Sequence, residues 1–322
     1  GAYHPFDGDG MLHAVYIEDG AARYRNRWIE SKGLLAERAR GRACYGGMTN
    51  FSFPDDDVMQ EGGMMKNTAN TATVRHAGRF FSMLEASLPT EFDRDLRTLG
   101  EYEFGGRLDG PFTAHPKVDP ISGEMIFFGY SPIAPYLRYH EVDASGQLVH
   151  SADIDLPAGV MMHDFAITER YAVFFDAPSV FNLDAMSTGE PMLSWRPENG
   201  TRIGIMPRRG TSSDIRWFEI PNCYVVHFSN AWDDGDTIEI RAPRMEDMPN
   251  AFAAEPGGAR EPMPWRWELD LGTGSVIDEQ TDDVPGEFPR INDAMIGQHN
   301  RFGYDSTARG WDTNFDFNGV MQ

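Results

Sequence analysis

The stretch that best indicates the fold is Met11-Leu-His-Ala-Val-Tyr-Ile17, followed by Glu18-Asp-Gly20 and then by Ala21–Ile29. Two alternating runs are joined there by Asp-Gly, a pair that suits the tight turn of a β-hairpin. The same arrangement recurs where His76-Ala-Gly78 separates Ala72–Arg75 from Arg79–Glu85. The start of the chain is therefore predicted to be built from hairpins.

Short runs of this kind continue along the chain. Turns such as Ser145-Gly146 and Asp234-Gly235 separate them. The further runs are Glu124–Tyr130, Leu137–Val142, Gln147–Leu156, Asp164–Ile167, Tyr171–Phe175, Ile215–Ile220, Cys223–Asn230 and Thr237–Arg241. Many short, evenly spaced strands indicate a sandwich, a barrel or a propeller, and their large number favours a propeller.

Few other features interrupt this pattern. Ser31–Arg42 is compatible with one short helix, and Pro243–Pro264, rich in Pro, Gly and acidic residues, is expected to be a surface loop. Asn314–Gln322 has the pattern of a last strand. No blade motif repeats legibly. We predict a single all-β domain over residues 1–322.

Composition limits the classes of partner. The net charge is −22 and apolar residues make up 41% of the chain. Nucleic-acid binding requires clustered lysine and arginine, so we expect no nucleic-acid partner, and an anionic membrane surface would repel such a chain. The acidity favours solubility, and the apolar content suffices for a sizeable core.

Two features bear on the compartment. The chain has 2 cysteines, Cys44 and Cys223, neither in a metal-binding or disulfide-rich spacing, which suggests a reducing, cytoplasmic location. No apolar run approaches the length of a membrane span and no signal peptide is visible, although the sequence starts at Gly1 and a preceding segment would not be seen.

Three histidines lie between apolar residues near predicted strand ends. They are His115, His163 and His227, spaced along the chain by about one or two propeller blades. Neutral imidazoles brought together on a propeller axis would suit iron, zinc or copper. Alternatively, each is a hydrogen-bonded core residue, which is the commoner role of a histidine on an apolar strand.

The remaining histidines have less distinctive surroundings. His76 and His140 are expected at turns or strand ends, and His13 and His150 within strands. His299, in Gly297-Gln-His-Asn-Arg301, is expected in a loop. A metal role for any of these is less favoured.

Six strings of residues resemble the carotenoid cleavage oxygenase family, in the family's order and over nearly the whole chain. They are Phe6-Asp-Gly-Asp-Gly-Met11, Lys66-Asn-Thr-Ala-Asn-Thr71, Phe112-Thr-Ala-His-Pro-Lys117, Met162-His-Asp-Phe-Ala-Ile-Thr168, His227-Phe-Ser-Asn-Ala-Trp232 and Glu287-Phe-Pro-Arg-Ile291. The resemblance implies a seven-bladed β-propeller, here incomplete at both ends.

The resemblance also implies a metal centre. The family binds Fe(II) through four histidines, of which His115, His163 and His227 match three, and the fourth has no counterpart in this chain. Glu85 and Glu287 match two of the glutamates that orient the ligands in the family. A carboxylate that accepts the second N–H of an imidazole fixes its tautomer.

The activity implied is cleavage of a conjugated C=C bond by O₂ into two carbonyl products. Thr71 matches a position near the vacant iron site, although an ordinary strand threonine is an equal alternative. Met48 and Leu84 fall where lignostilbene-type members hold a phenol, and neither can bind a phenolate, so a carotenoid or apocarotenoid is favoured over a stilbene. Phe6 is expected to line the substrate tunnel, or else to be ordinary core.

The expected partners are an apolar polyene and O₂, with room for peripheral membrane contact during substrate uptake. Three alternative hypotheses remain open. The protein could be a scaffold propeller without metal, a glycosidase-like hydrolase or a truncated, inactive oxygenase. A hydrolase would need paired carboxylates, for which Asp164 and Asp233–Asp236 are the candidates.

Overall fold

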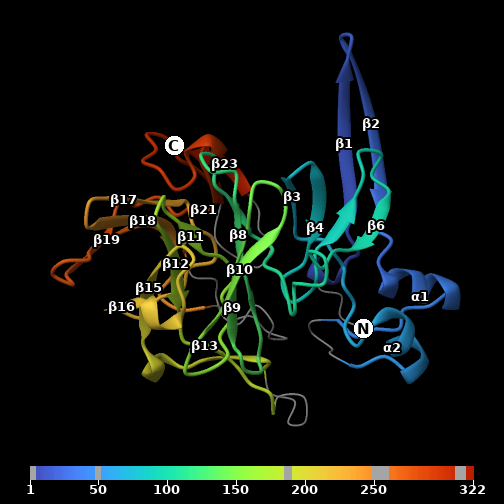
Figure 1. Ribbon diagram of the computed structural model, residues 1–322, viewed down its shortest axis with the longest axis horizontal. Helices are drawn as coiled ribbons and strands as arrows, with labels where there is room; N and C mark the ends of the chain where they lie inside the picture. Colours follow the sequence, from blue (N-terminus) through green and yellow to red (C-terminus); the bar gives the residue numbers. More distant parts are fainter. Residues whose placement is uncertain (1–4, 48–51, 185–190, 249–260, 309–316) are drawn as a thin grey trace. The chain divides into compact units, whose positions relative to one another are not determined.

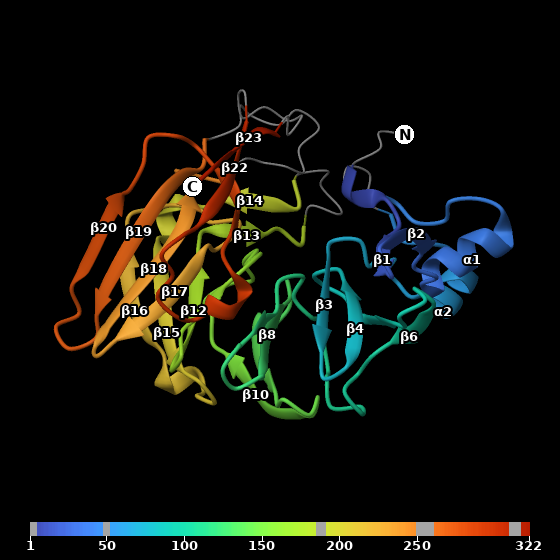
Figure 2. The same cartoon turned by 90° about the horizontal axis from the view of Figure 1, so that it is seen from above.

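The computed structural model describes residues 5–47, 52–184, 191–248, 261–308 and 317–322, which fall into two compact units. The first comprises Gly1–Ala114 and Ala144–Leu148, and the second comprises His115–Asp143 and Val149–Gln322. Strands dominate both units (Figures 1 and 2), so the all-β prediction is confirmed. The prediction of one continuous domain stays a prediction.

The first unit contains the hairpin with which the sequence opens. Strands β1 (Met11–Glu18) and β2 (Ala21–Trp28) pair in antiparallel register, with Glu18 opposite Ala21. Asp19 and Gly20 have φ angles of 50° and 75°, the left-handed conformation that a type I′ turn requires. The predicted hairpin is therefore confirmed.

A four-stranded sheet and two helices complete this unit. The sheet runs β3-β4-β5-β6, and the turn between β3 and β4 is the predicted one at Ala77-Gly78. Its strands are β3 (Ala72–His76), β4 (Arg79–Met83), β5 (Thr90–Phe92) and β6 (Thr98–Glu101). Helix α1 (Lys32–Arg40) begins at Ser31, whose hydroxyl accepts the N–H of Leu34, and confirms the predicted helix. Helix α2 (Asp56–Gly62) was not predicted from the sequence.

The second unit is built from sheets that follow one another along the chain. Their strand orders are β10-β9-β8-β7, β11-β12-β15-β16, β17-β18-β19-β20 and β21-β22-β23. The first sheet comprises β7 (Lys117–Val118), β8 (Met125–Tyr130), β9 (Leu137–Val142) and β10 (Leu148–Ile154). The second comprises β11 (Ala166–Ile167), β12 (Tyr171–Asp176), β15 (Thr201–Pro207) and β16 (Arg216–Ile220).

The later sheets follow the same plan. The third comprises β17 (Asn230–Asp234), β18 (Thr237–Arg244), β19 (Met263–Asp270) and β20 (Val276–Gln280), and the fourth comprises β21 (Glu287–Arg290), β22 (Tyr304–Ala308) and β23 (Phe317–Met321). A hairpin of β13 (Ser179–Phe181) and β14 (Leu193–Trp195) falls between β12 and β15 along the chain and forms a separate two-stranded sheet. Short 3-10 helices lie at Pro5–Asp7, Pro197–Asn199, Ser212–Asp214 and Asp293–Met295.

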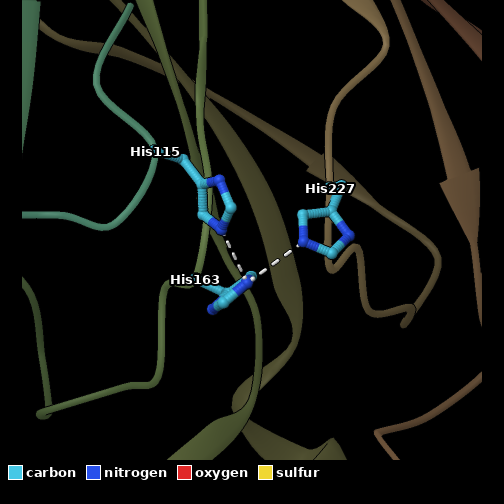
Figure 3. A group of neighbouring side chains, drawn as sticks. All are labelled: His115, His163 and His227. Carbon is cyan, nitrogen blue, oxygen red and sulfur yellow. Dashed lines mark hydrogen bonds between the residues drawn. The ribbon is translucent and has the colours of Figure 1, made fainter. Parts of the chain in front are cut away.

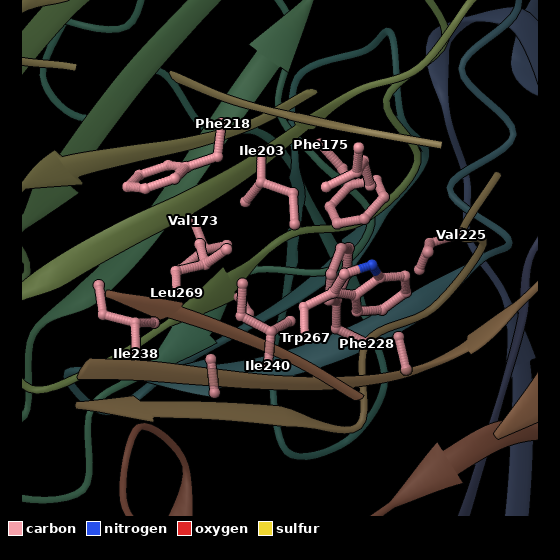
Figure 4. Packing of buried hydrophobic residues seen from close by; sticks show 14 of the residues in the cluster. Val173, Phe175, Ile203, Phe218, Val225, Phe228, Ile238, Ile240, Trp267 and Leu269 are labelled. Atoms are coloured by element: carbon pink, nitrogen blue, oxygen red, sulfur yellow. The ribbon is translucent and has the colours of Figure 1, made fainter. Parts of the chain in front are cut away.

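The core of the second unit lies between neighbouring sheets. Strand β12 is buried on both faces, and its alternating side chains serve two separate clusters. Phe174 packs toward the first sheet, where its ring centroid lies 5.8 Å from that of Tyr139. Phe175 packs toward the third sheet, 5.1 Å from Trp267 (Figure 4). This double burial explains why the central strands have nearly continuous apolar sequences.

Two sequence predictions were wrong in detail. The four- and three-stranded sheets of the described residues make five blades, not seven. The physical reason is that the described residues 11–47 and 52–62 form a hairpin and helices instead of a blade, and β13–β14 forms a separate two-stranded sheet. The predicted loop Pro243–Pro264 begins and ends inside paired strands, with Pro243 opposite Pro264, and its middle, 249–260, lies outside the described residues.

Two smaller observations complete the comparison. The predicted last strand is present as β23, and its residues 314–316 lie outside the described part. Among the described residues, every helix is too short or too polar to cross a membrane.

Candidate metal centre

Each of the three singled-out histidines lies two or three residues before the strand that opens a sheet. His115 precedes β7, His163 precedes β11 and His227 precedes β17. Each of these strands lies at the edge of its sheet. The three histidines therefore occupy equivalent positions in three successive sheets, and this repetition brings them together.

Figure 3 shows the three rings turned toward one another. Nε2 of His163 lies 3.0 Å from Nε2 of His115 and 3.2 Å from Nε2 of His227. One nitrogen of each ring lies within 4.8 Å of the corresponding nitrogens of the other two. The group is half-buried, and among the described residues it alone has the spacing of a metal-binding cluster.

Glu287 determines the tautomer of His227. Its Oε2 accepts a hydrogen bond of 2.8 Å from Nδ1 of His227 and another from the backbone N–H of Phe288. Because a carboxylate oxygen only accepts, the proton of the neutral ring sits on Nδ1, and Nε2 presents its lone pair to the centre. Glu287 is the first residue of β21 and is 7% exposed, so a fourth sheet supports the site.

Burial keeps the ring of His115 neutral. It is the largest cause that lowers the pKa of His115 to about 2; the charge of Asp164 opposes this shift, and the neighbouring imidazoles add to it. A metal ion binds only the neutral form of imidazole. The ring of His115 is therefore available as a ligand across the physiological pH range.

The donor set fits a metal ion of the first transition series. Nitrogens bound cis to one ion at about 2.1 Å lie about 3.0 Å from each other. The two measured separations, 3.0 and 3.2 Å, match that spacing. An all-imidazole set suits iron, zinc or copper and suits calcium or magnesium poorly, because those ions prefer oxygen ligands.

Asp164 and Lys117 belong to the site, although the sequence did not predict this role for either residue. Nζ of Lys117 lies 2.7 Å from Oδ1 of Asp164, which is buried. Burial alone would raise the pKa of Asp164, but Lys117 and the nearby imidazoles lower it to about 2. The sequence feature that could have indicated this role is a charged residue close to each of two histidines, in His115-Pro-Lys117 and His163-Asp164.

The other predicted site residues lie in the first unit. Glu85 and Leu84 are half-buried just after β4, and the exposed Thr71 donates its backbone N–H to Met83. Their place around the histidines stays a prediction. Phe6 is 56% exposed in the first 3-10 helix, and Met48 lies outside the described residues.

Two of the remaining histidines have ordinary structural hydrogen bonds. His140 is buried, and its Nδ1 lies 2.8 Å from the hydroxyl of Ser151. Burial lowers its pKa to about 4. Nε2 of His150 bonds to the carbonyl of Gly210 at 2.8 Å.

Among the described residues, His299 is not part of the cluster formed by His115, His163 and His227. Its ring packs edge-on against Trp232, with 5.0 Å between ring centroids. The exposed His13 bonds to Tyr24 within the β1–β2 hairpin, and His76 is buried in the first unit.

Two of the carboxylates weighed for a hydrolase have cationic partners. Asp164 is paired with Lys117, and Asp233 accepts Nε of Arg170 at 2.7 Å. Asp164 and Asp233, held by cations in this way, are unsuited to protonating a leaving group as a glycosidase requires.

Comparison with known proteins gives a consistent assignment. Residues 1–322 match the family model described as retinal pigment epithelial membrane protein. The chain is 36% identical to carotenoid 9,10(9',10')-cleavage dioxygenase 1 of Arabidopsis thaliana over 95% of this chain and 62% of that protein. It is 34% identical to isoeugenol monooxygenase of Pseudomonas nitroreducens, over 94% of this chain and 65% of that protein.

A solved structure shows the same fold. The lignostilbene dioxygenase of Pseudomonas brassicacearum aligns with a TM-score of 0.84 and 32% identity, over 94% of this chain and 65% of that chain. The present chain thus spans less than two thirds of the length of these three relatives. Its sheets are blades of a β-propeller, and with a family match along its entire length the chain belongs to the retinal pigment epithelial membrane protein family, which includes the carotenoid cleavage oxygenases.

Proposed function

We propose that the protein is a non-haem iron(II) dioxygenase that cleaves a conjugated C=C bond of a carotenoid or apocarotenoid. His115, His163 and His227 are the proposed iron ligands. The observation that carries this proposal is the convergence of three imidazoles, one of them oriented by the carboxylate of Glu287. The two alkene carbons each take one oxygen atom from O₂, and two carbonyl products leave.

Iron is favoured by the chemistry of the relatives. The donor set alone also accepts zinc and copper, but the relatives carry names of dioxygenases and a monooxygenase, whose reactions need a redox-active centre. When bound, Fe(II) would activate O₂ toward the alkene, and the alkene provides the electrons that O₂ takes up. The protein's own contribution is to hold three imidazoles in place and to keep the ring of His115 neutral through burial.

Leu84 supports an apolar substrate. It is half-buried, and by resemblance it replaces a phenol-binding residue of the lignostilbene-type enzymes. A leucine cannot form a hydrogen bond or ion pair with a phenolate, whereas it suits a hydrocarbon chain. A carotenoid or apocarotenoid is therefore the first candidate.

A phenolic aryl alkene is the second candidate. The similarity to isoeugenol monooxygenase, at 34% identity, and to lignostilbene dioxygenase, at 32%, is close to the 36% shared with the plant carotenoid enzyme. Sequence similarity alone therefore does not rank the two substrate classes, and the substrate assay below separates them.

The test is turnover by the iron-loaded protein. Fe(II) is added without oxygen, and then ¹⁸O₂ is supplied with an apocarotenoid, a hydroxystilbene or isoeugenol. Mass spectrometry should show aldehyde or ketone products of the apocarotenoid, each with one ¹⁸O. Cleavage of only the phenolic alkenes would establish the second candidate instead.

Three variants and one control test the ligands. His115→Ala, His163→Ala and His227→Ala should each abolish iron binding and turnover. His299→Ala, which changes a histidine packed on Trp232, should leave both intact. Turnover that survives loss of any of the three, or that is lost with His299→Ala, would overturn the proposed ligand set.

A further inference from the structure

One buried carboxylate contacts all three histidine-bearing segments. Oδ1 of Asp164 accepts Nζ of Lys117 at 2.7 Å and the backbone N–H of Phe165 at 2.8 Å. Its other oxygen, Oδ2, accepts the backbone N–H of Phe228 at 2.9 Å. Both oxygens are therefore used, and the donors come from three separate parts of the chain.

Each donor segment contains one of the clustered histidines. Lys117 follows His115 by two residues, and Phe228 directly follows His227. Asp164 itself directly follows His163. A single side chain thus joins the openings of three neighbouring blades at the point where each presents its imidazole.

The energetics of this contact favour a positional role over a general stabilising one. Asp164 is 3% exposed, and the side chain of Lys117 is 18% exposed. Removing two charges from water costs about as much as their attraction returns, and an apolar pair of similar size often stabilises a fold equally well. Hydrogen bonds are directional, however, so this carboxylate fixes the relative positions of its donors in a way that an apolar side chain cannot.

We infer that Asp164 is a positioning residue that sets the spacing of His115, His163 and His227. By bonding to the segments of all three, it holds their Nε2 atoms in the arrangement whose measured separations are 3.0 and 3.2 Å. The significance of this arrangement for metal binding rests on the proposed function, whereas the tie between the segments does not.

The test compares Asp164→Asn, Lys117→Met and the double variant. Asparagine has the same shape but turns an NH₂ group toward one of the donors, so at least one segment loses its tie. Co(II), a redox-inert probe with a visible spectrum, reports the site. We expect Asp164→Asn to lower Co(II) affinity by about 10- to 100-fold, the range typical for residues that support metal ligands.

The double variant separates positioning from stability. Asp164→Asn alone leaves a largely buried ammonium group without its counterion, which should lower the unfolding temperature. Adding Lys117→Met removes that charge, so the unfolding temperature should recover toward that of the parent while Co(II) affinity stays low. If the unfolding temperature and the Co(II) affinity both recovered in the double variant, Asp164 would serve only the stability of the fold. That result would overturn the inference.

Asp176→Asn is the matched control. Asp176 is another buried aspartate paired with an arginine, Arg202 at 2.8 Å, and it contacts none of the three histidine segments. Its replacement should leave the Co(II) affinity and spectrum unchanged. An equal loss of affinity in this control would also contradict a specific role for Asp164.

A metal-free measurement keeps the inference independent of the proposed function. In a crystal structure of the metal-free double variant, the Nε2 separations around His163 should exceed those of the parent. Unchanged separations would overturn the inference whether or not the protein binds metal. A parent protein that fails to bind Co(II) would instead overturn the proposed metal centre, and the ring positions would still decide the role of Asp164.

Discussion

Replacing Glu287 by glutamine is expected to weaken metal binding while the fold persists. Glu287 is 7% exposed, and its Oε2 accepts Nδ1–H of His227 at 2.8 Å. Glutamine has the same length and keeps one amide oxygen for this hydrogen bond. The substitution therefore removes the charge and leaves the shape, which isolates the electrostatic contribution of the carboxylate to the ligand.

The size of the effect follows from the two kinds of hydrogen bond. A bond to a charged acceptor contributes about 1.5–3 kcal/mol, whereas a neutral one contributes about 0.5–1.5 kcal/mol. The difference is about 1–2 kcal/mol, and because 1.36 kcal/mol is a factor of ten, affinity should fall about 5- to 30-fold. Glu287→Ala should cost more, since it leaves both His227 Nδ1–H and the N–H of Phe288 without this acceptor.

Competition between the protein and a chelator of known affinity for Co(II) provides the assay. The matched control is Glu279→Gln, the same change at an exposed glutamate of β20 that lies 2.7 Å from Arg266. The control should bind Co(II) as the parent does, and circular dichroism should show that both variants are folded.

Two results would refute this reasoning. If Glu287→Gln binds Co(II) within twofold of the parent, the carboxylate does not tune the ligand. If Glu279→Gln loses as much affinity as Glu287→Gln, the loss reflects the net charge of the protein and not the contact with His227.

Three further predictions concern stability. Burial, reinforced by the charge of Glu287, raises the pKa of Asp305 to about 6. The folded state therefore holds this proton more tightly than the unfolded chain, and the free energy of unfolding should fall as the pH rises from about 4 to about 6. After allowance for solvent screening the loss is about 1–2 kcal/mol, and Asp305→Asn should abolish that pH dependence in denaturant titrations. Trp267→Ala removes a fully buried ring from its packing on Phe175 and should cost about 3–5 kcal/mol in the same titrations, where a loss below about 1 kcal/mol would contradict the packing described. Ser31→Ala should lower stability by about 1 kcal/mol because it removes the N-cap of α1, while Ser31→Asp, which can cap in the same way, should not.

Local features were predictable from the sequence because they depend on neighbouring residues. The β1–β2 turn follows from Asp19-Gly20, two residues that accept the left-handed conformation, and α1 follows from a serine cap and a short helical run. Helix α2 was missed because its short run, with few buried side chains, carries little periodic signal. The count of seven blades came from the family resemblance and not from any local signal, and the described residues make five blades.

The sequence by itself determined which residues could form the centre. The strings around His115, His163 and His227 identified the family and hence the candidate ligands, and the string at Glu287 identified a partner for one of them. Chain spacing could not show that Nε2 atoms from three sheets approach within 3.0 and 3.2 Å.

Only the tertiary structure decided how the centre is held together. The bond from Phe228 to Asp164 joins residues 64 positions apart, and the bond from His227 to Glu287 joins residues 60 positions apart. Such contacts arise because successive blades repeat the same path and bring the openings of their edge strands to one place. Their geometry depends on how the sheets pack through residues such as Phe174 and Phe175, and this packing is a property of the assembled fold that no single segment encodes.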